Sequence, residues 1–252
     1  MSSTLEERMT PPARPDGSPA VRRSRVRGML HALSTVLIVS GVLLLADAGL
    51  TVAWQEPLSA VYNHFQQSKL SGQLDKDIDA KLAPTPIEKR ALKTLPDAKS
   101  RIAFAARALD RKIKPGQPIG RIRIPAIGMN KVVVEGTTED ILPKGPGHYP
   151  AQPLPGAPGT VAFAGHRTTY GAPFRRVDEL DPGDRIVFEM PYAKVTYRVD
   201  HTKIVLPTDL AVTDRKPFNQ VILTACNPLY SAAQRIVIFA RQVKAEPSKS
   251  LY

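Results

Sequence analysis

The chain has 252 residues, a single cysteine and a formal net charge of +12. This length fits one ordinary domain with appendages, and one cysteine excludes an intramolecular disulfide framework. The lysines and arginines are scattered along the sequence instead of forming one basic stripe, which argues against a nucleic-acid partner.

The N-terminal region consists of a polar tail and a long apolar run. Residues 1–28 hold few large apolar side chains and several prolines, so we expect a disordered cytoplasmic tail. Residues 29–54 are long enough to cross a bilayer as a helix and predict a transmembrane signal anchor. Four arginines precede this run, at positions 22, 23, 25 and 27. By the positive-inside rule, the N-terminus lies in the cytoplasm and the remainder lies outside the cell membrane.

A cleaved signal peptide is the competing interpretation of this apolar run. Ala46-Asp47-Ala48 has the small-x-small form of a cleavage site. The run exceeds the roughly 7–15 apolar residues usual for a signal core, which favours a retained anchor. Both interpretations place the rest of the chain outside the cytoplasm.

Residues 55–114 are polar and favour helix. Apolar side chains between positions 102 and 113 recur at helical spacing, so residues 99–113 predict an amphipathic helix that packs on a neighbouring surface. We interpret the whole segment as an extracytoplasmic stalk followed by this docking helix. A loose spacer over residues 55–95 is the alternative.

After Pro115 the apolar pattern changes to that of strands. Short runs of β-branched and aromatic residues are bounded by Gly, Pro, Asp or Asn, as in "KVVVEG", "GTVAFAG", "DRIVFEM", "NQVILTAC" and "RIVIFARQV". Their regular spacing without long helices predicts an antiparallel barrel or sandwich of seven or eight strands over residues 115–245. "MPYAK" between two runs predicts a hairpin loop. Residues 246–252 are expected to form a C-terminal tail.

The single thiol, Cys226, ends the strand "QVILTAC", and Pro228 prevents an ordinary central strand from continuing. The thiol is either an inert buried group, an intermolecular link or a nucleophile. A free thiol with a pKa near ~8.5 is mostly protonated at neutral pH, so a nucleophile needs a base or a positive neighbour.

Three histidines of the β-rich region could supply that base. His201 falls inside a strand, which favours a structural role, and His148 is expected in a loop. His166 closes the strand "GTVAFAG" and so matches the strand-end position of Cys226. If these two strand ends are neighbours, imidazole and thiol come together, as a Cys-His pair requires. Arg235 opens the next strand, and its guanidinium can hold an oxyanion but cannot act as the base.

The segments "AGHRTTYGAPFRRVDELDPGD" and "LTACNPLYSAAQRIVIFA" resemble the sortase family, most closely the class E sortases of actinobacteria, which are Gram-positive. "IPAIG", "VVEGT", "GPGHYP" and "PGAPGTVAFAGH" follow in the expected order, and the resemblance covers residues 115–245. It implies a mainly β fold: a closed eight-stranded sortase β-barrel with short helices, preceded here by the transmembrane helix and helical stalk. It also implies that Cys226, His166 and Arg235 are the catalytic residues. The family commonly has a threonine where Ala225 stands, which puts fine substrate preference in question.

The resemblance implies a membrane-anchored cysteine transpeptidase. Such an enzyme cleaves an LAXTG- or LPXTG-like C-terminal sorting signal of a secreted protein between Thr and Gly through a thioacyl intermediate. It then transfers the protein to the amine of a lipid-linked peptidoglycan precursor. Tyr149 is a candidate for the pocket that reads the second residue of the signal, and simple packing of its ring on the barrel is the alternative.

Two other functions stay open. A pilin-polymerising sortase would use a lysine of a pilin subunit as acceptor, although the sequence has neither an Asp-Pro-aromatic lid nor a C-terminal membrane helix. A catalytically silent barrel that binds a wall protein is the second. "LTACNP" does not resemble the Ser-x-Gly-Cys segment of L,D-transpeptidases. No cofactor and no metal are expected, because His and acidic residues do not recur at ligand spacing.

Overall fold

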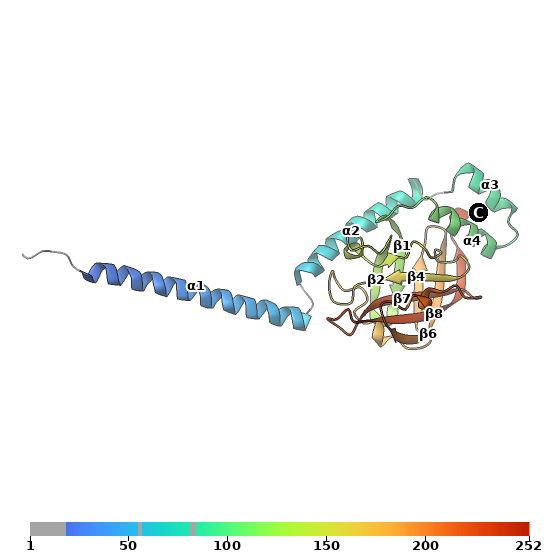
Figure 1. The fold of residues 1–252 in the computed structure, drawn as a ribbon. Coiled ribbons are helices and arrows are strands. Elements are labelled where there is room, and N and C mark those ends of the chain that lie inside the picture. The colour runs from blue at the N-terminus through green and yellow to red at the C-terminus, as the bar shows by residue number, and fades with distance from the viewer. Residues whose placement is uncertain (1–18, 55–56, 81–83, 252) are drawn as a thin grey trace, which may run out of the picture. The chain divides into compact units, whose positions relative to one another are not determined.

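The structure, a computed structural model, describes residues 19–54, 57–80 and 84–251. The chain divides into two compact units, Met1–Gly49 and Leu50–Tyr252. The described residues of the first unit are helical, and the second unit contains a β-barrel with its covering helices (Figure 1).

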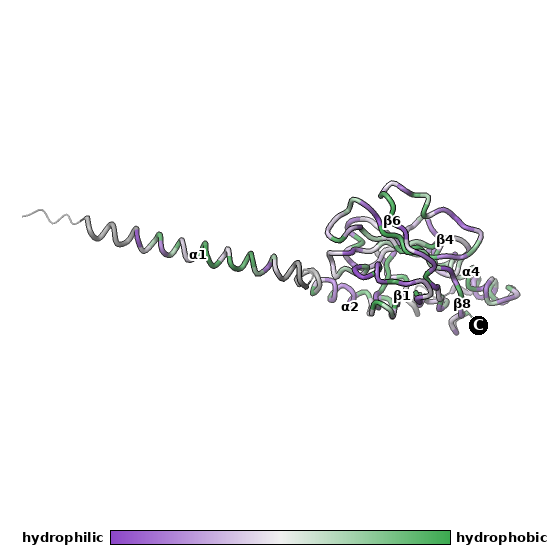
Figure 2. The backbone as a smooth tube through the Cα atoms, turned by 90° about the horizontal axis from the view of Figure 1, so that it is seen from below, coloured by the Kyte–Doolittle hydropathy of each residue, from purple (hydrophilic) through white to green (hydrophobic). Residues whose placement is uncertain are grey.

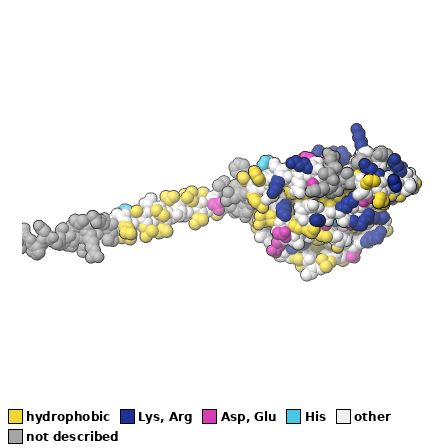
Figure 3. All heavy atoms as spheres, turned by 90° about the horizontal axis from the view of Figure 1, so that it is seen from above, with side chains coloured by type: hydrophobic (Ala, Val, Ile, Leu, Met, Phe, Trp, Pro, Cys, Tyr) yellow, Lys and Arg dark blue, Asp and Glu magenta, His cyan; other side chains and the backbone are white. Residues whose placement is uncertain are grey.

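Helix α1 spans Pro19–Trp54. Residues 27–49 have a mean hydropathy of 2.2 and none of the window is buried, so this one helix is long and apolar enough to cross a membrane. Figure 2 colours many residues of this stretch as hydrophobic, and Figure 3 shows hydrophobic side chains along its surface. The helix begins ten residues before the predicted span, which corrects the expectation of a disordered tail up to residue 28. The reason is that residues 20–27 contain no Pro or Gly, and arginine is a good helix former. Residues 1–18 of that tail lie outside the described residues.

Eight strands form a closed barrel in the order β1-β2-β3-β4-β7-β8-β6-β5. The strands are β1 Pro118–Ile124, β2 Met129–Glu135, β3 Gly147–His148, β4 Thr160–Ala164, β5 Arg185–Glu189, β6 Ala193–Val205, β7 Gln220–Asn227 and β8 Gln234–Pro247. The predicted mainly β class with a closed eight-stranded barrel is confirmed. The predicted hairpin is also present, because Met190 and Ala193 exchange backbone hydrogen bonds across a two-residue loop.

Two pairings in the barrel are parallel, β2 with β3 and β4 with β7, whereas the strand spacing had predicted an antiparallel arrangement. The parallel pair β4–β7 places the ends of both strands at the same end of the barrel. Alternation along the strands directs one set of side chains inward. The interior is filled by large apolar groups, among them Phe163, Phe174, Phe188 and Tyr197, none of which is exposed to solvent.

Helices α2 to α4 belong to the same unit as the barrel. Helix α2, Pro57–Ala80, packs against β1 and β2. Helix α3, Pro86–Thr94, begins with a capping box between Thr85 and Glu88. Helix α4, Ala98–Asp110, corresponds to the predicted docking helix and buries Ile102, Ala106 and Leu109 in the main core. Because α2 covers residues 57–80, this part of the segment is helical and is not a loose spacer. Short 3-10 helices occupy Pro125–Ile127, Leu142–Lys144, Val177–Glu179, Leu210–Thr213 and Lys249–Leu251.

The C-terminal segment was expected to form a tail, but it packs against the rest of the unit. Strand β8 continues to Pro247, and the Ser248 amide donates a 2.8 Å hydrogen bond to the Tyr192 carbonyl. Leu251 is 4% exposed and joins the main core. Burial of this leucine supplies the driving force for ordering these last residues.

Candidate active site

Cys226 lies near the end of β7 and is a free, half-buried thiol. In the antiparallel ladder between β7 and β8, its partner is Arg235, the second residue of β8. Directly opposed residues of antiparallel strands have Cβ atoms roughly 4.5–5.5 Å apart. The sheet therefore brings a thiol and a guanidinium side by side at one end of the barrel.

His166 reaches the same end from the other neighbour of β7. In the parallel ladder between β4 and β7, Ala164 pairs with Thr224, and the Gly165 amide donates a 3.0 Å hydrogen bond to the Thr224 carbonyl. His166 and Cys226 each follow two residues beyond that pair. The three residues singled out in the sequence thus gather at one end of three adjacent strands, β4, β7 and β8.

The His166 imidazole is half-buried and packs against the Tyr170 ring in a tilted arrangement, with 5.0 Å between ring centroids and 45° between ring planes. Burial lowers its pKa from the ordinary value of 6.5, because desolvation disfavours the charged form. The ring is therefore mainly neutral near pH 7. Within the described residues it makes no hydrogen bond to the Cys226 thiol, and catalytic contacts of this kind commonly tighten only when substrate binds.

Arg235 has one guanidinium nitrogen in use. Its Nη1 donates 2.9 Å hydrogen bonds to the carbonyls of Ala232 and Gln234, which hold the loop between β7 and β8. Nε and Nη2 make no hydrogen bond to the described residues. The side chain can therefore stabilise the loop and still offer donors to a negatively charged oxygen.

A buried arginine that the sequence analysis missed connects the loops of this site. Arg167 follows His166 directly and is 4% exposed. Its Nη1 donates to the Asn227 side-chain oxygen at 2.7 Å and to the Cys226 carbonyl at 3.4 Å, and its Nη2 forms a 2.8 Å ion pair with Asp178. The only sequence sign of this role is its position next to His166.

Tyr149 lies on the outer face of the same strands. Its hydroxyl and that of Thr224 are hydrogen-bonded at 2.9 Å, and Thr224 precedes Cys226 by two residues on the same face of β7. The ring packs on an outer apolar cluster of Ala162, Val205, Ile222, Val237 and Phe239. Tyr149 therefore packs its ring on the barrel and also bonds to the face of β7 that carries Cys226.

Ala225 points the opposite way. It is 2% exposed and belongs to the main core inside the barrel. A threonine at this position would place its hydroxyl in the interior, so the alanine changes barrel packing and not the face that carries Cys226.

Two other histidines differ from each other in environment. His148 was expected in a loop, but it forms β3 and is fully buried, with Nδ1 2.8 Å from the Glu135 carboxylate and Nε2 3.2 Å from the Pro153 carbonyl. A strand of two residues is too short to show periodicity in sequence, which explains the wrong assignment. His201 is exposed and stacks on Phe239 with a centroid separation of 4.5 Å.

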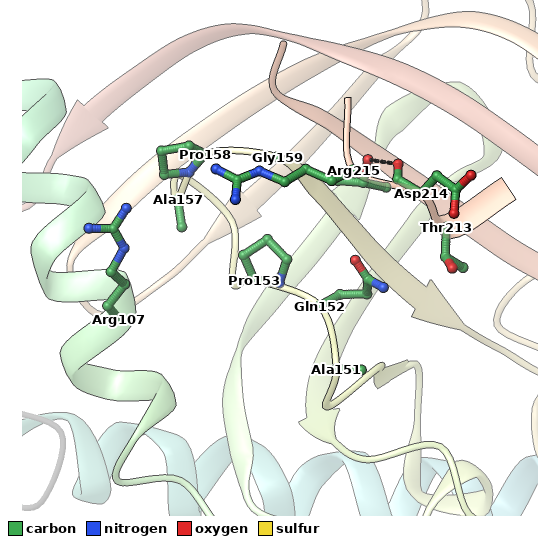
Figure 4. A pocket seen from close by; sticks show the side chains of 11 residues that line it. Arg107, Ala151, Gln152, Pro153, Ala157, Pro158, Gly159, Thr213, Asp214 and Arg215 are labelled. Carbon is green, nitrogen blue, oxygen red and sulfur yellow. Dashed lines mark hydrogen bonds between the residues drawn. The ribbon is translucent and has the colours of Figure 1, made fainter. Parts of the chain in front are cut away.

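A separate cavity of about 490 Å³ lies where β4 begins, at the end of that strand away from His166. Its lining includes Arg107 of α4, Arg215, Pro153 and Ala157–Gly159 (Figure 4). Six residues of extended chain separate Thr160 from His166, which corresponds to about 20 Å. This cavity is therefore not part of the thiol site.

Comparison with known proteins assigns the chain to a family. A family model described as "Sortase domain" matches residues 122–243. The chain is 35% identical to Sortase D of Bacillus subtilis over 66% of its own length and 81% of that protein, and 27% identical to Sortase SrtE1 of Streptomyces coelicolor over 97% of its own length and 64% of that protein. Among solved structures, a Clostridium perfringens Sortase D5 transpeptidase aligns with a TM-score of 0.56 at 22% identity, covering 71% of this chain and 99% of the other. The chain belongs to the sortase family of cysteine transpeptidases and is similar to its class E members.

Proposed function

We propose that this sortase is a membrane-anchored enzyme that cleaves an LAXTG- or LPXTG-like sorting signal between Thr and Gly and joins the released protein to a cell-wall precursor amine. The observation that supports this function best is the placement of His166, Cys226 and Arg235 at one end of three adjacent strands. A silent binding barrel would have no need for this convergence.

In the proposed mechanism, Cys226 is the nucleophile and His166 is the general acid and base. A proton moves from the thiol to the imidazole, and the thiolate attacks the Thr carbonyl carbon. The imidazolium then gives its proton to the departing Gly amine as the C–N bond breaks, leaving a thioacyl enzyme. An incoming amine attacks the thioester, a new amide forms, and the proton lost by that amine restores the starting thiol through His166.

Arg235 is proposed to stabilise the negative charge on the carbonyl oxygen in both tetrahedral steps. It stands opposite Cys226, and its Nε and Nη2 are not hydrogen-bonded to other described residues. A pre-positioned cationic donor at a developing oxyanion is a large contribution to rate in acyl transfer.

The half-buried ring of Tyr149, which packs on the outer apolar cluster, is proposed to contact the signal. Leu and Ala or Pro side chains of the signal are apolar and can pack on an aromatic ring. Tyr149 is hydrogen-bonded to Thr224, two residues before Cys226 on the same face of β7, and this position supports a contact with the second residue of the signal.

The N-terminal helix supports an extracytoplasmic catalytic domain. Arginines precede the 27–49 span and Trp54 ends α1, so the N-terminus is proposed to be cytoplasmic. Secreted proteins and lipid-linked acceptors both reach the outer face of the membrane, where an anchored barrel would meet them.

The test is peptide ligation by the full-length protein in detergent. LAXTG and LPXTG peptides are incubated with and without a glycine-based amine, and the products are identified by mass spectrometry. Cleavage between Thr and Gly and an amine-dependent ligated product are expected, and Cys226→Ala should give neither. Cleavage at another bond would contradict the proposed signal. Ligation only to a lysine-containing pilin peptide would contradict the proposed acceptor.

A further inference from the structure

The exposed face of α2 carries large apolar side chains in its first described turns. Val61, Tyr62 and Phe65 are 70%, 47% and 75% exposed. Phe65 is four residues after Val61 and three after Tyr62, so it lies between them on one side of the helix, and the three side chains form one ridge. The opposite face is buried through Asn63, Leu70 and Leu74.

The same exposed face becomes cationic further along the helix. Lys69 and Lys76 follow Phe65 at spacings of 4 and 11 residues, which keeps them on its side of the helix, and both are exposed. Aromatic and aliphatic groups followed by lysines match the boundary between the acyl chains and anionic headgroups of a bilayer.

The ridge also lies close to the candidate membrane span along the chain. Helix α1 ends at Trp54 and α2 begins at Pro57. From the end of the span at Gly49, five helical residues to Trp54 add about 8 Å, a three-residue step spans at most about 11 Å, and eight further helical residues to Phe65 add about 12 Å. The chain therefore limits the separation between the end of the span and the ridge to about 31 Å.

Helix α2 is fixed to the barrel by polar contacts. Gln67 accepts a 2.7 Å hydrogen bond from the Val132 amide and donates to the carbonyls of Lys144 at 2.7 Å and Val132 at 3.2 Å. Asn63 donates to the Pro143 carbonyl at 3.3 Å. If a membrane surface binds the ridge, these contacts therefore fix the orientation of the barrel on that surface as well.

Asn63 connects the ridge to the loop that follows His166. A Cβ atom on Gly171 would come within 2.7 Å of the Asn63 side-chain oxygen, so helix and loop are in direct contact. Gly171 has a φ of 69°, a conformation that favours glycine. The fixed orientation of α2 thus extends to the loop that carries His166 and Tyr170.

We propose that Val61, Tyr62 and Phe65, with Lys69 and Lys76, form a face that docks on the outer leaflet of an anionic phospholipid membrane. Docking holds the end of the barrel with Cys226 at a set height above the bilayer, where a lipid-linked acceptor is presented. The docking itself requires only the inserted α1, whereas its benefit to transfer rests on the proposed function.

The direct test is quenching of tryptophan fluorescence by brominated lipid. Trp54 is the only tryptophan, so it is replaced by Phe, and a reporter is introduced as Phe65→Trp or, in the control, as Ile87→Trp. Ile87 is 79% exposed on α3. Full-length protein is reconstituted in phosphatidylcholine vesicles with and without phosphatidylglycerol. We expect severalfold stronger quenching at position 65 than at position 87, and stronger quenching when phosphatidylglycerol is present.

Equal quenching at the two positions would overturn the proposal. A blue-shifted position-65 emission that depends on protein concentration but not on brominated lipid would assign the ridge to a second copy of the chain, which also overturns it. Lys69→Ser with Lys76→Ser should remove the dependence on phosphatidylglycerol while leaving thermal stability unchanged.

A second readout separates docking from catalysis. Phe65→Ser with Val61→Ser should lower transfer to a lipid-linked acceptor in vesicles severalfold but leave cleavage of a soluble peptide unchanged, and Ile87→Ser should alter neither. If neither the parent protein nor any variant cleaves the peptide, the proposed function is wrong. The quenching experiment still tests membrane docking in that case, because it does not depend on catalysis.

Discussion

Arg167, the residue after His166, donates a 2.7 Å hydrogen bond to the side-chain oxygen of Asn227, the residue after Cys226. The same guanidinium also reaches the Cys226 carbonyl and pairs with Asp178. One buried cation therefore connects the strand end that carries the imidazole with the strand end that carries the thiol.

Replacing Arg167 by alanine should lower both stability and activity. Loss of charge-assisted hydrogen bonds costs about 1.5–3 kcal/mol, and the freed strand ends should reduce kcat more than they raise KM. Urea unfolding and peptide cleavage measure the two effects. Arg176→Ala, which removes an exposed pair with Glu179, should cost at most about 1 kcal/mol. Equal effects of the two substitutions would contradict the connecting role of Arg167.

Replacing Arg235 by lysine should damage catalysis without unfolding the barrel. Lysine keeps the charge but lacks the fork that serves loop carbonyls and oxyanion together. We expect kcat to fall roughly 10²–10³-fold, the range for loss of an oxyanion donor. Arg241→Lys on the same strand is the matched control and should retain activity. Near-normal kcat in Arg235→Lys would assign this arginine to loop structure only.

The pH dependence of stability should contain a contribution from His166. Burial lowers its pKa in the folded protein below 6.5, so between 6.5 and the folded value the unfolded chain binds more protons. Stability from this residue is therefore present above pH 6.5 and decreases as the pH falls below it. Melting temperatures from pH 7.5 to 5 should decrease less steeply in His166→Gln than in the parent protein.

The same depressed pKa predicts the acid limb of the activity profile. In the free enzyme this limb of kcat/KM should have its midpoint below 6.5. A midpoint above 6.5 would show that a charged neighbour, and not desolvation, controls the imidazole.

The buried pair of His148 and Glu135 should behave as a coupled unit. Their side chains are 0% and 6% exposed, so removing one partner leaves a buried polar group without its main contact. Glu135→Leu should lower the free energy of unfolding by about 3–5 kcal/mol, the range for breaking a buried pair. The exposed Glu139→Leu is the control. If His148→Leu combined with Glu135→Leu costs the full sum of the single changes, the pair is not coupled.

The ring of Tyr149 should affect the preference of the enzyme between LAXTG and LPXTG peptides. Tyr149→Phe removes the hydrogen bond to Thr224 and should cost about 1 kcal/mol of stability while keeping the ratio of kcat/KM for LAXTG and LPXTG peptides. Tyr149→Ala should change that ratio, whereas Thr224→Val should match the Phe variant. An unchanged ratio in the Ala variant would leave Tyr149 with a packing role alone.

Much of the barrel could be predicted from sequence because its longer strands contain β-branched residues that alternate between inside and outside. Strand β3 could not, because Gly147–His148 gives no period. Parallel pairing of β4 with β7 also has no local pattern, since the partners are about 60 residues apart. Arg167 was missed for the same reason: its contacts at Cys226 and Asn227 are 59 and 60 positions away. The three residues proposed for catalysis could be identified from the sequence because each stands at one end of a predicted strand.

The central claim is that Cys226 forms a thioacyl enzyme with a sorting signal, and intact-mass measurement of the full-length protein tests it most directly. Mixing with an LAXTG or LPXTG peptide in the absence of amine should add the mass of the acyl fragment, peptide mapping should place it on Cys226, and later addition of a glycine-based amine should remove it. The Cys226→Ala protein should stay unmodified. A thiol that alkylates readily but acquires no acyl group from either peptide, or an adduct that maps to another residue, would contradict the account.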